Sequence, residues 1–81
     1  MELQMTNKTG VCKHVNRWDL VTVGGRKAVG SVTEFNEKDG EFVKGFHVNI
    51  AGEQFVVPRT GTRLDAITLT KTLINAYVRA M

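Results

Sequence analysis

Residues 62–81, TRLDAITLTKTLINAYVRAM, decide the fold because they carry the one long periodic pattern in the chain. Polar side chains recur along this stretch at spacings of three and four residues, which is the repeat of an α-helix with one polar and one apolar face. The polar side comprises Thr68, Thr72, Asn75 and Arg79, and the apolar side comprises Ala66, Leu69, Leu73, Ala76, Tyr77 and Ala80. The pattern predicts an amphipathic helix from about residue 62 to residue 80.

The start of this helix is marked chemically. Thr62 precedes Asp65 by three residues, which approximates a capping box. The Thr62 hydroxyl can accept a hydrogen bond from a first-turn amide, and the Asp65 carboxylate lies near the positive end of the helix macrodipole. We therefore expect the helix to begin at Thr62.

Before the helix, short β-favouring runs alternate with turn residues. The predicted strands cover residues 11–15, 18–23, 27–35, 41–50 and 54–57. The predicted breaks are Asn16-Arg17, Gly24-Gly25, residues 36–40 with Asp39-Gly40 at their end, and residues 51–53. Gly24-Gly25 is a strong hairpin signal, because glycine accepts the positive φ that primed turns require. Pro58 removes a ladder donor and should end the last strand.

These elements predict an α+β fold in which an antiparallel β-meander of four to five strands carries one C-terminal amphipathic helix on one face. Phe42, Phe46 and Val48 fall on one side of the predicted strand 41–50, and we expect that side to face the helix. Residues 1–10 are predicted to be a flexible N-terminal segment, and residues 11–81 a single α+β domain.

The chain has 81 residues, enough for one domain whose core is near the lower limit of independent stability. Cys12 is the one cysteine, so no intrachain disulfide can form, which is typical of a reducing compartment. Residues 1–10 lack the basic start and apolar run of a signal peptide, and no stretch approaches the ~18 apolar residues of a membrane span. We expect a soluble, cytoplasmic (intracellular) protein that does not contact membranes.

The net charge of +3 is unevenly distributed. Residues 1–33 and residues 58–81 each carry +3, whereas residues 34–57 carry −3. Such a chain can present an acidic and a basic surface on different sides. It does not show the uniformly basic stripe that is typical of nucleic-acid-binding domains.

Residues that could support catalysis or metal binding are few. The one serine, Ser31, lies in a predicted strand without the sequence of a nucleophile elbow. Cys12 and His14 form a C-x-H pair, but a structural zinc site needs two further ligands and only His47 remains. We predict a protein that is not an enzyme and that binds no metal or other cofactor.

Two pairs of basic residues are candidate contacts for a nucleic acid or another acidic partner. Arg26 and Lys27 lie at the predicted hairpin tip, where they could reach a phosphate backbone. Arg59 and Arg63 flank the predicted helix start. If the two pairs converge on one surface, direct DNA or RNA binding is the alternative function.

A different surface favours a protein partner. If Phe42 lies in the core, the opposite face of the sheet is smooth and weakly apolar. The predicted interface on that face comprises Val32, Val43, Gly45, His47 and Val56. A two-fold pairing of this face with the same face of a second copy would give a homodimer.

These observations predict a small non-enzymatic binding protein. Small domains without a catalytic set and with a mixed-charge surface are typical of accessory or inhibitory factors. Phages and mobile elements encode many such factors, including the anti-CRISPR inhibitors. We expect the partner to be a protein component of nucleic-acid-handling machinery, with direct nucleic-acid binding as the alternative.

Overall fold

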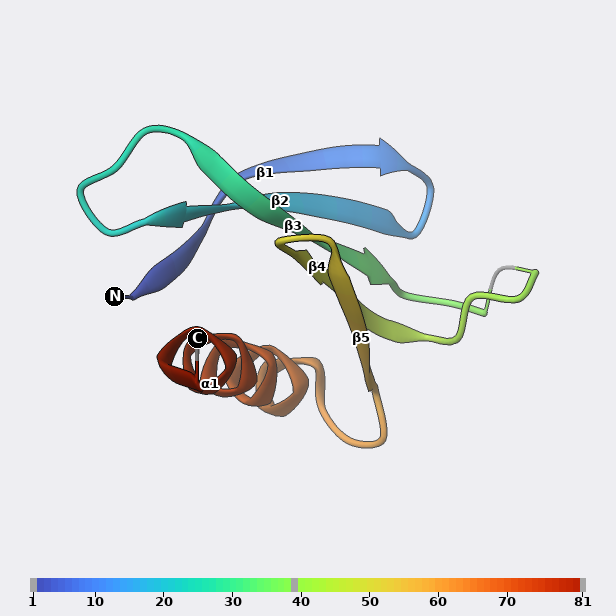
Figure 1. Ribbon diagram of the computed structural model, residues 1–81. Helices are drawn as coiled ribbons and strands as arrows, with labels where there is room; N and C mark the ends of the chain where they lie inside the picture. The colour runs from blue at the N-terminus through green and yellow to red at the C-terminus, as the bar shows by residue number, and fades with distance from the viewer. Residues whose placement is uncertain (1, 39, 81) are drawn as a thin grey trace.

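The computed structural model describes residues 2–38 and 40–80, and these residues form five strands and one helix (Figure 1). The elements are β1 (Leu3–Cys12), β2 (Val15–Thr22), β3 (Ala28–Phe35), β4 (Gly45–Ile50), β5 (Glu53–Pro58) and α1 (Arg63–Ala80). Each strand pairs antiparallel with the next, in the order β1-β2-β3-β4-β5, and α1 packs on one face of the sheet. The predicted α+β meander with a C-terminal helix is confirmed.

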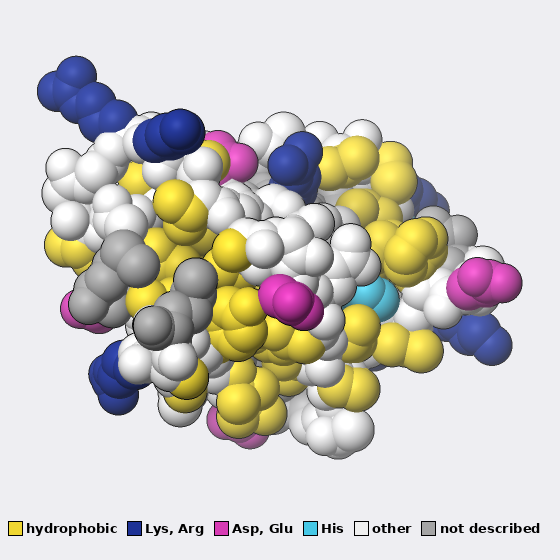
Figure 2. Space-filling view, in the orientation of Figure 1, with side chains coloured by type: hydrophobic (Ala, Val, Ile, Leu, Met, Phe, Trp, Pro, Cys, Tyr) yellow, Lys and Arg dark blue, Asp and Glu magenta, His cyan; other side chains and the backbone are white. Residues whose placement is uncertain are grey.

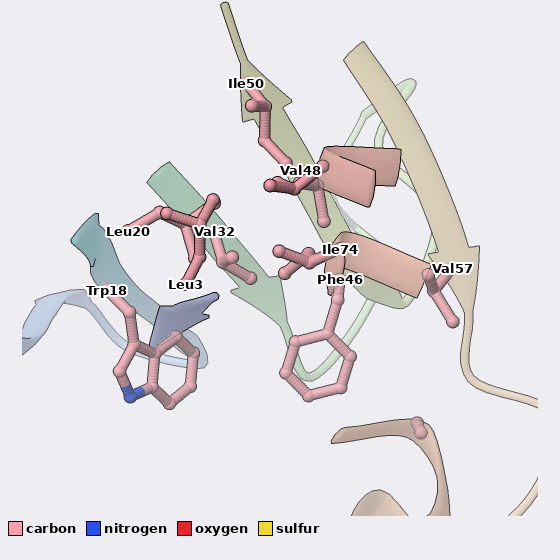
Figure 3. Close-up of a cluster of buried hydrophobic side chains, with 11 residues drawn as sticks. Leu3, Trp18, Leu20, Val32, Phe46, Val48, Ile50, Val57 and Ile74 are labelled. Carbon is pink, nitrogen blue, oxygen red and sulfur yellow. The ribbon is translucent and has the colours of Figure 1, made fainter. Parts of the chain in front are cut away.

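The core lies between the sheet and α1. Figure 3 shows Ile74 of α1 among Val32, Phe46 and Val48 of the sheet, all of which are buried. The other buried members of this cluster are Leu3, Trp18, Leu20, Ile50, Val57, Ala66 and Val78. Burying each large apolar side chain contributes about 1.5–3 kcal/mol before the entropic cost of folding.

The buried face of α1 differs from the predicted one. Residues at a spacing of four, Ala66, Thr70, Ile74 and Val78, face the sheet. Thr70 is tolerated there because its hydroxyl donates to the Ala66 carbonyl oxygen at 2.7 Å, so no polar atom is left unpaired. Leu69 and Leu73 were predicted on the apolar, sheet-facing side, but 50% and 39% of their surfaces are exposed.

The N-terminal residues also differ from the prediction. Residues 3–10, expected in a flexible segment, belong to β1, whose first residue Leu3 is buried. The Leu3 N–H donates to Asn75 Oδ1 at 3.0 Å, which fastens the start of β1 to the second half of α1 (Figure 1). The first turn is at Lys13-His14 instead of Asn16-Arg17, and His14 adopts a φ of 68° there.

The predicted strand 41–50 begins only at Gly45. Gly45 has a φ of 146°, and a Cβ at this position would overlap the carbonyl oxygen of Val57 on the neighbouring strand. Glycine is therefore required where β4 begins. The chain before Gly45 leaves the ladder, so Phe42 does not share the face of Phe46. Of the predicted Asp39-Gly40 turn, Asp39 lies outside the described residues.

The pairing of β3 with β4 sets which side chains face the helix. Val32 lies opposite Val48, and Glu34 lies opposite Phe46, so each pair shares a face of the sheet. Val32 was predicted on the open face, but it is fully buried against α1. That prediction is wrong because it assigned the wrong side of β3 to the core.

Glu34 is consequently a buried carboxylate, with 1% of its side chain exposed. Arg63, the first residue of α1, donates from Nε to Glu34 Oε2 at 2.6 Å and from Nη2 to Oε1 at 3.0 Å. Asn16 Nδ2 donates to the same Oε1 at 3.2 Å. These hydrogen bonds join β2, β3 and α1 through one carboxylate.

The hydrogen bond to Glu34 raises the pKa of Arg63 above its ordinary value, although desolvation acts in the opposite direction. A raised pKa on a cation adds stability that is lost only when the pH rises through that value. The guanidinium therefore stays charged across the working pH range of a protein.

The predicted helix cap can be tested directly. The Asp65 N–H donates to Thr62 Oγ1 at 3.1 Å, so Thr62→Ala should lower the free energy of unfolding by about 1 kcal/mol. Thr60→Ala, in the exposed connection before the helix, is the matched control and should be nearly neutral. Urea unfolding of both variants checks this, and equal losses would show that the cap does not contribute.

Candidate functional site

The open face of the sheet, which we define as the face turned away from α1, carries a group of aromatic and apolar side chains from β3, β4, β5 and the connection before β4. Side chains alternate between faces along a strand, so the neighbours of the core residues project onto the open face. Thr33, His47 and Val56 form one row across β3, β4 and β5. The neighbouring row contains Ser31, Asn49 and Gln54 and is polar.

An aromatic cluster occupies one end of this face. Phe42 stacks on Phe35 with ring centroids 4.8 Å apart and an interplanar angle of 3°. The His47 ring stands edge-on to both, at 4.9 Å from Phe35 and 5.6 Å from Phe42. His47 Nε2 also lies 3.1 Å from the Val43 carbonyl oxygen. These contacts hold the connection before β4 against the sheet.

We define the open-face patch as Phe35, Phe42, Val43, His47 and Val56. Exposed fractions are 51% for Phe42, 44% for Val43 and 43% for Val56. Figure 2 shows a histidine side chain bordered by hydrophobic side chains on this part of the surface. A hollow of about 280 Å³ lies beside the cluster and extends over the polar row. The patch therefore combines apolar area with hydrogen-bonding groups at its border.

Three of the five predicted interface residues, Val43, His47 and Val56, come together in this patch. Val32 lies in the core, and Gly45 is buried where β4 approaches β5. Phe35 was not predicted as an interface residue, and Phe42 was predicted to lie in the core. The available signal was the alternation of side chains along β3. The face opposite to Val32 carries Val29, Ser31, Thr33 and Phe35, so assigning Val32 to the core would have placed Phe35 on the open face.

The two basic pairs do not converge. Arg26 and Lys27 precede β3 at the end of the sheet where Gly30 lies opposite Ile50, whereas Arg59 follows Pro58 at the end where Gly45 lies. The six residues of β4 separate these ends by about 20 Å. Arg63 is hydrogen-bonded to the buried Glu34. A single basic surface formed by all four residues is therefore not present.

The residues considered for catalysis or metal binding lie in different surroundings. Cys12 is exposed at the end of β1. His14 lies 3.6 Å from a Glu37 carboxylate oxygen, whereas His47 packs in the aromatic cluster. Within residues 2–38 and 40–80, no three His, Cys, Asp or Glu side chains are grouped so that they could hold a metal ion. Ser31 lies within β3 on the open face.

In the described part of the chain, no helix has the length and apolar character required to cross a membrane. Comparison with protein-family models, with curated proteins and with solved structures gives no match to this chain.

The difference between the core and patch aromatics can be measured. Phe46 is fully buried, so Phe46→Ala should lower the free energy of unfolding by about 3–5 kcal/mol. Phe42→Ala removes a half-exposed ring and one stacking contact, and it should cost only about 1 kcal/mol. Equal losses in urea unfolding would mean that Phe42 is a core residue in solution.

Proposed function

We propose that this chain is a non-enzymatic binding protein whose open-face patch docks onto another protein. The observation that carries the proposal is that the exposed Phe42 and Val56 border the same hollow as Phe35 and His47, with the exposed Val43 next to Phe42 in the chain. Large apolar side chains gathered on one face are characteristic of protein interfaces, whose buried centres are enriched in aromatic residues and where a few residues carry most of the binding energy.

The geometry of the patch supports this use. Phe42 is held by stacking on Phe35 and by the His47 edge, so little side-chain entropy remains to be lost on binding. The polar row beside it offers hydroxyl and amide groups from Thr33, Asn49 and Gln54 for the rim of an interface. A rigid aromatic centre with a polar rim suits a protein surface.

We propose further that the partner belongs to nucleic-acid-handling machinery and that the chain acts on it as an accessory or inhibitory factor, as anti-CRISPR proteins of phages and mobile elements do. The charge distribution supports this part of the proposal. Glu37 and Glu41 are exposed in the connection that carries Phe42, together with Lys38 and Lys44. The segment 34–57 as a whole carries a net charge of −3, which suits a basic surface of the kind that proteins that handle nucleic acids commonly present.

The proposal predicts capture of a protein that depends on Phe42. Immobilised wild-type chain, Phe42→Glu and Val23→Glu should be incubated with nuclease-treated lysate of the cells in which the chain acts. Val23 is the matched control, because it is an exposed apolar residue in the β2–β3 connection, outside the patch. The same protein should be retained by wild type and Val23→Glu, and the purified pair should bind at least about tenfold more weakly with Phe42→Glu.

Direct nucleic-acid binding is the alternative outcome. Electrophoretic shifts on duplex DNA, single-stranded DNA and RNA should then appear at low salt, with an affinity that falls by about 0.9 log units per phosphate contact for each log unit of salt on duplex DNA. Loss of these shifts in the double variant Arg26→Ala and Lys27→Ala, with Phe42→Glu unaffected, would replace the open-face patch with the hairpin tip as the functional site.

A further inference from the structure

The outer edge of β5 exposes backbone groups that can form a further ladder. The Arg59 N–H donates to the Lys44 carbonyl oxygen at 3.0 Å, so the backbone at this position points toward β4. Orientation alternates along an antiparallel strand, which directs the backbone groups of Gln54, Val56 and Pro58 away from β4. Because β5 is the last strand of the sheet, these groups lie on a free edge.

We infer that this edge pairs with β5 of a second copy, antiparallel and centred on Val56. In this register the Val56 N–H of each copy donates to the Val56 carbonyl of the other, and the Gln54 N–H donates to the Pro58 carbonyl. Pro58 has no N–H to donate in return, but its carbonyl remains available. This inference does not depend on the proposed function.

Charge complementarity selects a second copy as the occupant of the edge. With Val56 on the two-fold axis, Glu53 of each copy lies directly opposite Arg59 of the other. Glu53 is exposed and Arg59 is half-buried, and both belong to the set of positions whose side chains are on the α1 side of the sheet. The strand thus carries an acidic residue and a basic residue at equal distances from its centre, as an isologous contact requires.

The surroundings of the edge are apolar on the α1 side. A groove of about 400 Å³ runs between β5 and α1, lined by Phe55, Leu73, Ala76 and Tyr77 together with Glu53 and Gln54. Figure 2 shows hydrophobic side chains continuing from β5 to α1. Leu69 and Leu73, which the sheet of the same copy leaves exposed, lie along this side of α1. A second copy across the β5 edge would cover them.

The opposite edge of the sheet is built differently. β1 is interrupted by irregularities between Thr6 and Thr9 and between Gly10 and Cys12, and Asn7 has a φ of 56°. Such irregularities and edge lysines, here Lys8, discourage pairing with another chain. Residues 54–57 carry neither a bulge nor a charge, and Pro58 is the one outward-facing position of β5 that lacks an N–H. Pairing through β5 would also bring the two Val56 side chains together and join the two open-face patches on one side of a shared sheet.

Sedimentation of charge-swap variants tests this pairing. The wild type should shift from about 9.0 kDa toward twice that mass between micromolar and millimolar concentration. With Arg59→Glu, position 59 of each copy places a carboxylate opposite Glu53 of the other, so the dimer contains two repulsive contacts. The dissociation constant of the dimer should therefore rise at least about tenfold. Adding Glu53→Arg to Arg59→Glu reverses both charges and should restore the wild-type constant within about threefold.

Lys13→Glu, in the turn between β1 and β2 and away from β5, is the control with the same change in charge and should leave the dimer unchanged. Amide hydrogen exchange gives an independent readout, because the Val56 and Gln54 amides should become protected as the concentration rises. A wild type that stays at 9.0 kDa at millimolar concentration, or a double variant that remains as weak as Arg59→Glu, would overturn the inference. Neither of these two results depends on Phe42, so the proposed function is tested separately by the Phe42→Glu variant.

Discussion

The contact between Glu34 and Arg63 is the constraint on which the rest of the structure depends. A carboxylate with 1% of its surface exposed is tolerated in a core only when its charge is paired and its oxygens accept hydrogen bonds. Arg63 supplies both at the first residue of α1, and Asn16 adds a hydrogen bond from β2. The pair therefore fixes the start of the helix against the end of β3, the central strand of the sheet.

The contact between Glu34 and Arg63 also determines which apolar side chains remain exposed. With Arg63 turned toward β3, the next positions of the helix that face the sheet are Ala66, Thr70 and Ile74, so the leucines on the neighbouring side of α1 remain exposed. Because Glu34 and Val32 take the core side of β3, Phe35 takes the open side and provides the platform for Phe42. The exposed leucines of α1 and the open-face patch therefore both result from which side of β3 faces the core.

Local patterns in the sequence were sufficient for the helix, its cap at Thr62 and the order of the strands from residue 18 onward, but not for β1, most of which was predicted to be flexible. The sequence does not show which face of β3 points to the core, because this depends on which residue of β4 lies opposite Val32. In addition, a glutamate such as Glu34 is expected at the surface unless its partner Arg63 is known. Phe42 was assigned to the core by alternation with Phe46, which Gly45 interrupts. For the candidate site, Val43, Val56 and His47 were therefore predictable from the sequence, whereas the burial of Val32 and the aromatic platform of Phe35 and Phe42 were not.

A double-mutant cycle on Glu34 and Arg63, measured by urea unfolding, tests most directly whether this pair anchors the fold. Arg63→Met should cost about 2 kcal/mol or more, somewhat less than for a fully buried pair because Arg63 is partly exposed, since it leaves the Glu34 carboxylate buried without its cation. Adding Glu34→Leu should recover at least about half of that loss. A cost below about 0.5 kcal/mol for Arg63→Met, or losses that simply add in the double variant, would contradict the account.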